Sequence, residues 1–183
     1  VVAIVRLNSS ESLTRVAEAI AEGGVRFIEF TMTTPGALEV LGKVTERFGD
    51  DVIFGAGTVL DAETARAAIL AGARFVVAPN LNPEVITLCN RYSVPAMPGA
   101  LTPTEIVKVF PCSAFGPDYI KAVLAPLPHV KLAPVGGVEL GNVAEYMRAG
   151  AACVGVGSSL VNSKLIANGD WAGLTERARG FIE

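Results

Sequence analysis

Histidine is almost absent from this chain, which has only His129 among its 183 residues. Zinc and two-metal centres commonly use histidine ligands, and a Ser-His-Asp triad requires one, so both kinds of site are disfavoured. Cysteine is also scarce: Cys89, Cys112 and Cys153 are an odd number and form no C-x-x-C pair. We therefore expect small buried thiols in a reducing cytoplasm, with neither disulfides nor a metal site.

The chain also lacks long apolar runs and basic clusters. The net charge is −3 and 18% of the residues are charged, which argues against nucleic acid as a partner. No apolar stretch approaches the roughly 18 residues of a membrane span, and Val1–Val5 is too short for a signal peptide. Because 51% of the residues are hydrophobic, we expect residues 1–183 to form one globular domain.

Short apolar segments recur along the chain and read as β strands. Their starts are separated by 25, 26, 22, 20, 13, 23 and 23 residues. The eight predicted strands are Val1–Arg6, Arg26–Thr31, Val52–Gly57, Arg74–Pro79, Val94–Gly99, Val107–Pro111, Val130–Val135 and Cys153–Gly157.

Amphipathic segments between these strands predict helices, among them Ser10–Glu22, Asp61–Ala71, Pro83–Arg91 and Asn142–Ala149. Glycines follow several of them, as expected at helix C-termini. Eight βα units of regular period predict a single-domain α/β protein, a (β/α)₈ TIM barrel. A doubly wound open sheet is the alternative, but it usually has fewer strands.

One spacing departs from this period. Only 13 residues separate the starts at Val94 and Val107. Thr102–Glu105 has the residues of a helix start, yet strand residues follow at once, and a parallel crossover needs about a dozen residues or more. We expect that about one helix is missing before Val107.

Lys108 lies inside an apolar, β-branched run, Ile106–Pro111. Burial disfavours the ammonium form and lowers the pKa, which favours a nucleophilic amine of the kind that forms Schiff bases. The alternative is a strand-end lysine with its head in water. Lys131 is the rival nucleophile, but it opens its strand and is expected at the opposite face of the barrel.

Other polar groups fall where predicted strands end, which is the active-site face of such barrels. Glu29 lies between apolar neighbours, so a raised pKa would suit it for acid–base work, or it is the structural partner of a buried cation. Arg6 either pairs with a substrate carboxylate or is a side chain that faces solvent. Thr58 either hydrogen-bonds the substrate or caps the helix from Asp61.

Glycines follow the last two predicted strands. Gly136 and Gly137 come after the seventh strand, and Gly157 and Ser158 after the eighth. Backbone N–H groups at this place form the usual phosphate site of the fold. Each pair alone indicates only a tight turn, whereas both together predict phosphate binding.

Five segments carry a resemblance to a known family: IEFT around Glu29, GAGTVL at Gly55–Leu60, MPG at Met97–Gly99, KVFPCSAFGPDYIKA at Lys108–Ala122 and PVGGV at Pro134–Val138. They resemble the class I 2-keto-3-deoxy-6-phosphogluconate (KDPG) and 4-hydroxy-2-oxoglutarate (KHG) aldolases, with their 6-phosphogalactonate relatives. The resemblance implies a metal-independent lyase of Entner–Doudoroff carbohydrate metabolism. It also implies a cytoplasmic homotrimer that uses no cofactor.

The resemblance assigns roles to the candidates other than Arg6. Lys108 would form the Schiff base with pyruvate and the phosphorylated keto acid, and Glu29 would shuttle protons. The pyruvate pocket would be lined by Thr58, Pro79 and Phe110. The phosphate would be held by Gly136, Gly137, Gly157 and Ser158.

Two positions depart from the gluconate-specific pattern. Thr33 stands where many of those enzymes have arginine, and Val135 stands where they have threonine before the Gly-Gly pair. Valine there resembles the phosphogalactonate aldolases, so the preferred C4 epimer is open.

The predicted reaction cleaves a 2-keto-3-deoxy-6-phospho sugar acid to pyruvate and glyceraldehyde 3-phosphate. Two rivals differ in class. A phosphosugar isomerase or epimerase would share the phosphate site without needing a buried lysine. A non-catalytic assembly subunit would be favoured by a true deletion before Lys108, since the lysine strand would lose support.

Overall fold

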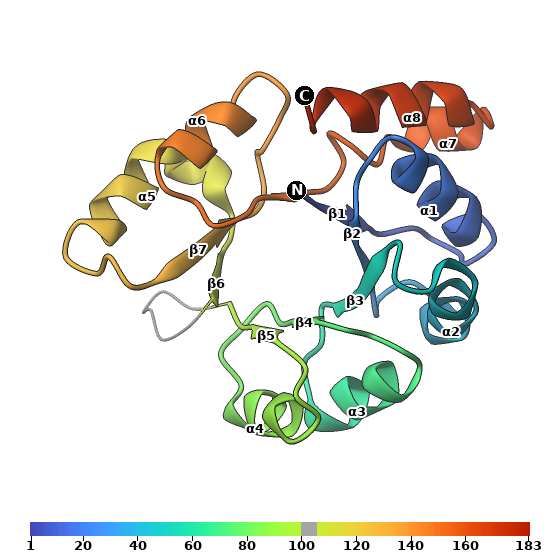
Figure 1. Cartoon of the computed structure of the whole chain (residues 1–183), viewed down its shortest axis with the longest axis horizontal. Coiled ribbons are helices and arrows are strands. Elements are labelled where there is room, and N and C mark those ends of the chain that lie inside the picture. The colour runs from blue at the N-terminus through green and yellow to red at the C-terminus, as the bar shows by residue number, and fades with distance from the viewer. Residues whose placement is uncertain (100–105) are drawn as a thin grey trace.

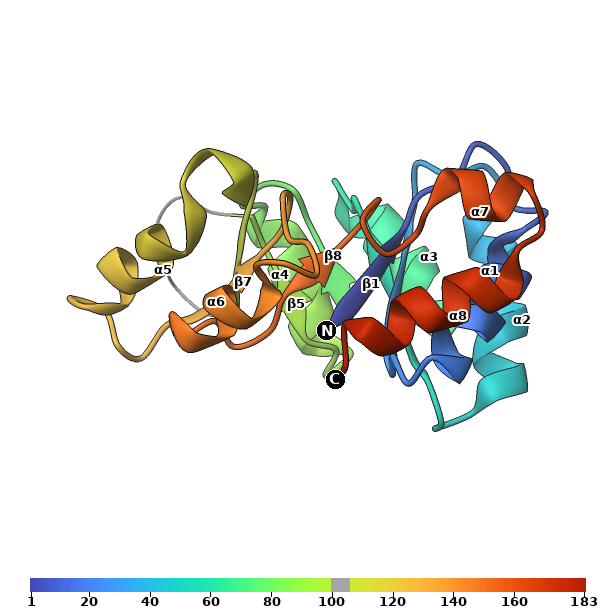
Figure 2. The ribbon, with the colours of Figure 1, turned by 90° about the horizontal axis from the view of Figure 1, so that it is seen from above.

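The computed structural model describes residues 1–99 and 106–183, and it alternates strands with helices throughout. The strands gather around a common centre and the helices lie outside them (Figure 1). From above, α5 and α6 lie on one side of the strands, and α1, α2, α7 and α8 on the other (Figure 2). The strands are β1 Val2–Val5, β2 Phe27–Thr31, β3 Ile53–Gly57, β4 Val76–Val77, β5 Ala96–Met97, β6 Ile106–Val109, β7 Lys131–Pro134 and β8 Gly155–Val156. The helices are α1 Leu13–Glu22, α2 Ala37–Phe48, α3 Ala62–Leu70, α4 Pro83–Arg91, α5 Gly116–Leu124, α6 Val143–Arg148, α7 Ser163–Ala167 and α8 Trp171–Gly180, with a 3₁₀ helix η1 at Cys112–Ala114.

The strands pair in parallel and in chain order. One sheet has the order β5-β4-β3-β2-β1-β8, and a second consists of β6 and β7. Isolated parallel bridges join Gly99 to Lys108 and Val135 to Gly155, at the two borders between these sheets. The predicted α/β alternation is confirmed. The pairing of the last strand with the first differs from the strand order of a doubly wound sheet.

The main core lies between the strands and the helices that cover them. The tilted rings of Phe30 and Phe54 contact each other at 5.6 Å between centroids, and Phe48 of α2 meets Phe54 edge-on at 5.5 Å. Along β2, Ile28 and Phe30 alternate with Glu29, so the glutamate points to the other face of the sheet. Period-two alternation therefore puts apolar side chains under the helices and the Glu29 carboxyl on the opposite face of the strands.

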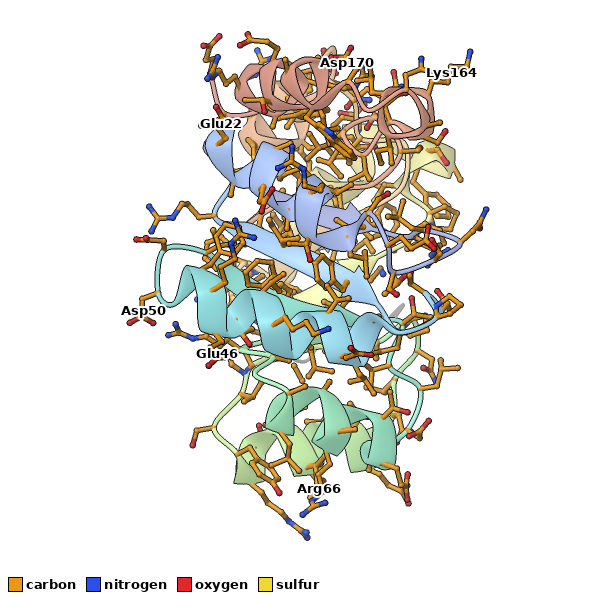
Figure 3. All side chains as sticks on the ribbon, turned by 90° about the vertical axis from the view of Figure 1, so that its right-hand side faces the viewer. Glu22, Glu46, Asp50, Arg66, Lys164 and Asp170 are labelled. Carbon is orange, nitrogen blue, oxygen red and sulfur yellow. The ribbon has the colours of Figure 1, made fainter. Side chains whose placement is uncertain are left out.

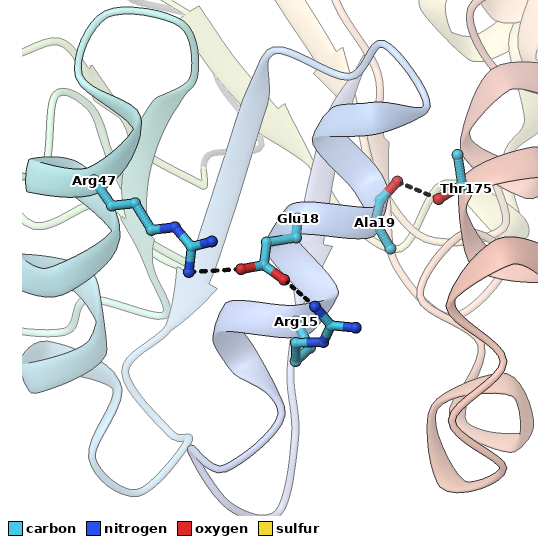
Figure 4. Close-up of polar contacts among 5 residues, drawn as sticks. All are labelled: Arg15, Glu18, Ala19, Arg47 and Thr175. Atoms are coloured by element: carbon cyan, nitrogen blue, oxygen red, sulfur yellow. Dashed lines mark hydrogen bonds and ion pairs between the residues drawn. The ribbon is translucent and has the colours of Figure 1, made fainter.

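Helix α1 is held on both sides. Glu18 pairs with Arg15 of its own helix at 2.7 Å and with Arg47 of α2 at 2.6 Å (Figure 4). On the other side the Thr175 hydroxyl of α8 donates to the Ala19 carbonyl at 2.9 Å. The first and last helices thus pack together, which places the chain ends on one side of the ring.

Charged residues lie on the outer surface of the helices. Glu22, Glu46, Asp50, Arg66, Lys164 and Asp170 all point away from the strands in Figure 3 and are exposed. Within the described residues, none of the helices has the length and apolar character that crossing a lipid bilayer requires.

Local chemistry explains where the helices begin and end. Asp61 caps α3 by accepting the Thr64 N–H at 2.6 Å. Gly72 and Gly150 follow α3 and α6 with φ of 101° and 102°, the left-handed conformation expected of glycine at a helix end. The helix start predicted at Thr102–Glu105 lies outside the described residues.

All eight strands are shorter than predicted, and three of them are much shorter. Strands β4, β5 and β8 each span two residues, whereas the sequence predicted five or six. Proline explains β5, because Pro95 and Pro98 flank it and have no N–H to extend a ladder.

Candidate active site

Lys108 lies on β6, where the sequence predicted it. Its backbone N–H donates to the Pro98 carbonyl at 3.0 Å, which ties β6 to the end of β5. The side chain is half-buried, and its Nζ lies 5.6 Å from the ring centroid of Phe110. Burial lowers the pKa of Lys108; the Glu29 carboxylate opposes this effect and the Arg6 charge adds to it. The solvent-exposed alternative for this lysine does not fit its burial.

Glu29 projects from β2 and is 2% exposed. Burial raises its pKa from 4.5 to about 7, although the charges of Lys108 and Arg6 act in the opposite direction. Within residues 1–99 and 106–183, its Oε1 is the only buried side-chain nitrogen or oxygen without a hydrogen-bond partner. A carboxyl group in this state can give or take a proton near neutral pH.

Arg6 and Thr58 meet at the ends of β1 and β3. The guanidinium donates to the Thr58 hydroxyl at 3.2 Å. Thr58 has φ of 58°, a conformation that β-branched residues rarely adopt. The helix that follows is capped by Asp61, so the interpretation of Thr58 as its cap is wrong. Arg6 is exposed, yet its charge acts on both Glu29 and Lys108.

A small cavity of about 110 Å³ opens at the lysine. Pro79 and Phe110, both predicted for the pyruvate pocket, line it with Gly99 and Val109. Phe115 and Tyr119 complete the lining and stack on each other at 4.9 Å. The sequence interpretation missed this pair. Their i, i+4 spacing does predict a shared helix face, but nothing in the spacing shows that the face turns toward Lys108.

The two predicted phosphate loops lie side by side. Gly136 and Gly137 have φ of 84° and 79°, and a Cβ on Gly137 would lie 2.6 Å from that of Ser113. The Ser159 hydroxyl donates to the Val138 carbonyl at 2.5 Å, joining the loop after β8 to the loop after β7. Gly157 has open space where a side chain would be, and Ser158 is exposed.

A larger cavity, of about 750 Å³, lies at the opposite ends of the strands. Its lining is mostly apolar and does not contain Lys108, which lines the smaller cavity; Glu29 lines neither. Lys131 opens β7 and is exposed, as predicted for the face away from the site. The chemistry therefore points to the smaller cavity. In the part of the chain that the structure describes, no three histidine, cysteine, aspartate or glutamate side chains gather into a metal-ligand cluster.

Comparison with known proteins identifies the family. The family described as "KDPG and KHG aldolase" matches residues 1–177. The chain belongs to the KDPG and KHG aldolase family. The resemblance found in the sequence is thereby confirmed.

Three relatives show how close the match is. The 2-dehydro-3-deoxy-phosphogluconate aldolase of Treponema pallidum is 37% identical over 194 residues, covering 100% of this chain and 92% of that protein. The 2-dehydro-3-deoxy-6-phosphogalactonate aldolase of Escherichia coli K12 is 36% identical, covering 87% of this chain and 83% of that protein. The solved KDPG aldolase of Legionella pneumophila, with pyruvate captured as a covalent carbinolamine, has a TM-score of 0.87 at 30% identity, covering 98% of this chain and 93% of that one.

The positions that depart from the gluconate pattern differ in their surroundings. Thr33 is exposed and donates its hydroxyl to that of Thr31 at 3.2 Å, beside the end of β2. Val135 is 8% exposed and forms the bridge to Gly155. Thr33 thus adds a neutral hydroxyl where an arginine would add a charge, and Val135 adds an apolar group beside Gly136 and Gly137.

Proposed function

We propose that this protein is a Schiff-base aldolase that cleaves a 2-keto-3-deoxy-6-phospho sugar acid to pyruvate and glyceraldehyde 3-phosphate. One observation carries the proposal. Lys108 is a half-buried lysine of lowered pKa, and the buried Glu29 carboxyl is close enough to influence that pKa. This pair supplies a nucleophilic amine and a proton carrier in a chain whose family consists of aldolases.

The first half of the reaction forms the imine. The neutral Lys108 amine attacks the C2 ketone, and a C–N bond replaces the C=O π bond. Glu29 moves one proton from the nitrogen to the oxygen, which gives the carbinolamine. In its protonated form Glu29 then gives a second proton to the departing hydroxyl, so water leaves, an iminium ion forms and Glu29 becomes a carboxylate. A carboxyl of pKa about 7 suits this relay because it holds and releases protons at neutral pH.

The second half breaks the carbon chain. Glu29 removes the proton of the C4 hydroxyl, and that oxygen forms the carbonyl of glyceraldehyde 3-phosphate. The C3–C4 electron pair moves into the iminium and leaves an enamine on Lys108. C3 then takes a proton, and water releases pyruvate and regenerates the amine.

Substrate binding divides between two groups of residues. Arg6 and Thr58 would hold the keto-acid carboxylate, with Pro79 and Phe110 against the pyruvate carbons. Backbone N–H groups of Gly136, Gly137 and Gly157, with the Ser158 hydroxyl, would hold the phosphate. Binding the phosphate far from the reacting carbons orients the C3–C4 bond.

The 6-phosphogalactonate epimer is a second candidate substrate, and Val135 favours it. The galactonate aldolase of E. coli is also nearly as similar to this chain as the gluconate aldolase of T. pallidum. The family description further includes 4-hydroxy-2-oxoglutarate aldolase, whose substrate lacks the phosphate.

We also propose that the eight strands close into one (β/α)₈ barrel that spans a single domain, residues 1–183. The bridges at Gly99–Lys108 and Val135–Gly155 support closure. The T. pallidum comparison extends over 194 residues although this chain has 183, so this chain is the shorter one over the matched region; the 13-residue spacing between Val94 and Val107 supports a shortened connection before Lys108. The family resemblance supports a cytoplasmic homotrimer, and the three free thiols fit a reducing compartment.

Steady-state kinetics with both C4 epimers and with 4-hydroxy-2-oxoglutarate test the function. Pyruvate release is followed with lactate dehydrogenase for the wild type, Lys108→Met and Lys131→Met. We expect turnover of a phosphorylated epimer by the wild type and Lys131→Met, and none by Lys108→Met. Turnover by Lys108→Met, or no cleavage of any of the three by the wild type, contradicts the proposal.

A further inference from the structure

Strand β3 has glycine at two positions where neighbouring side chains occupy the space of a Cβ atom. Gly55 and Gly57 both lie on this strand and pair with Glu29 and Thr31 of β2. A Cβ on Gly55 would lie 2.4 Å from ring atoms of Phe75, and a Cβ on Gly57 would lie 1.6 Å from the Oε1 atom of Glu29. Two large side chains from neighbouring segments therefore fill the space that two missing side chains leave.

The overlap at Gly57 involves the whole end of the Glu29 side chain. The added Cβ would overlap Oε1 and Cδ, and it would lie 2.6 Å from Cγ. Real Cβ atoms essentially never approach another heavy atom closer than 3.0 Å. Glu29 is buried, so its carboxyl cannot move aside into water without leaving this position.

Backbone conformation does not explain the glycine. Gly57 does not have a positive φ, and it lies in a regular parallel ladder with β2. A residue with a side chain can adopt this extended backbone, and glycine weakens a strand interior. The requirement for glycine here is a requirement for space.

We propose that Gly57 is a positioning residue: its missing side chain forms the seat that holds the Glu29 carboxyl inside the ring of strands, within electrostatic reach of Lys108 and Arg6. The catalytic part of this inference rests on the proposed function. A methyl group at position 57 would displace the carboxyl from the place where it relays protons, while leaving Lys108, Arg6 and the phosphate loops untouched.

A double-mutant cycle of thermal stability tests the seat without any activity measurement. The variants are Gly57→Ala, Glu29→Ala and the pair together. Glu29→Ala removes the three atoms that would lie nearest to the new methyl, Oε1, Cδ and Cγ of Glu29. We expect Gly57→Ala to lower Tm by roughly 3–10 °C in the wild type and to lower it little in the Glu29→Ala background.

Gly55→Ala is the matched control in the same cycle. It lies on the same strand, but the three atoms nearest to its methyl all belong to Phe75. Its loss of Tm should be the same in both backgrounds. A loss for Gly57→Ala that also stays the same in both backgrounds overturns the seat.

Kinetics of Gly57→Ala test whether the seat serves catalysis. We expect kcat for cleavage to fall about 100-fold or more, as a small misplacement of a catalytic group can do. KM should stay within about threefold, because the binding groups are unchanged. We expect the wild-type profile of kcat/KM, which reports the free enzyme, to have an inflection near pH 7, and this inflection should move or vanish in Gly57→Ala. Gly141→Ala, with no atom within 4 Å of its new methyl, should keep the wild-type values.

The two arms separate this inference from the proposed function. An inactive wild type rejects the proposed function. The stability cycle then tests by itself whether Gly57 makes room for the Glu29 carboxyl. An active wild type, an inactive Glu29→Ala and a Gly57→Ala variant with unchanged kcat and pH profile reject the positioning role. A Gly57→Ala variant that fails to fold, while the double variant folds, supports the seat.

Discussion

Replacing Glu29 by glutamine should make the protein more stable at alkaline pH than at acid pH relative to the wild type. The substitution keeps the shape of the side chain and removes its charge. Glu29 is buried and its Oε1 has no partner among the described atoms, so the charged form is the unfavourable one. The neutral amide therefore avoids the cost of burying a charge, and this cost grows as the carboxyl ionises.

The magnitude follows from the pKa. The folded-state pKa is about 7 and the ordinary value is 4.5. The folded chain thus holds the proton at pH values where the unfolded chain has lost it. The contribution of Glu29 to wild-type stability is therefore fully present below pH 4.5 and is lost as the pH rises through 7. Between pH 5 and pH 8 this one group should remove roughly 2–3 kcal/mol of wild-type stability.

Urea denaturation followed by circular dichroism measures the effect at pH 5, 6, 7 and 8. Every other titrating group is common to both proteins, so the difference between Glu29→Gln and the wild type isolates Glu29. Protein concentration is held constant because association would shift the apparent stability. Glu46→Gln removes an exposed carboxyl on α2 and should change stability by no more than about 0.5 kcal/mol at any of these pH values.

The reasoning is refuted by a stability difference that does not change with pH. Such a result would mean that Glu29 ionises in the folded protein as readily as in the unfolded chain. Its assignment as a proton carrier near neutral pH would then lose its physical basis.

Two further predictions concern substrate binding. Arg6→Met removes the guanidinium that donates a hydrogen bond to Thr58. KM for the keto acid should rise roughly 10–100-fold with a smaller change in kcat, since a hydrogen bond to a charged group is worth about 1.5–3 kcal/mol. An unchanged KM would exclude Arg6 from carboxylate binding. Gly137→Ala places a methyl at φ of 79° against Ser113 and should weaken binding of the phosphorylated substrate while sparing pyruvate, as isothermal titration of each ligand would measure. Equal loss for both ligands would contradict a phosphate role.

Periodicity made most of the fold predictable. The eight strands were foreseen because short apolar runs recur with a nearly constant spacing, and α4 was predicted with the bounds that it has, Pro83–Arg91. The lengths of β4, β5 and β8 were overestimated, because an apolar run shows burial and not the number of ladder hydrogen bonds.

The site was predictable where one residue carries the chemistry. A lysine and a glutamate inside apolar strands stand out by type alone. Phe115 and Tyr119 were missed because a helix face must be placed in space before its neighbours are known. The role of Gly57 could not be seen either, because a glycine in a strand predicts a close approach but does not name what approaches.

Borohydride trapping with pyruvate, followed by peptide mass mapping, tests the central claim most directly. Reduction of a Schiff base would leave a stable adduct on the lysine that formed it. The account predicts one adduct, on Lys108, in the wild type and none in Lys108→Met. An adduct on Lys131 or another lysine, or no adduct in a folded wild-type protein, would contradict it.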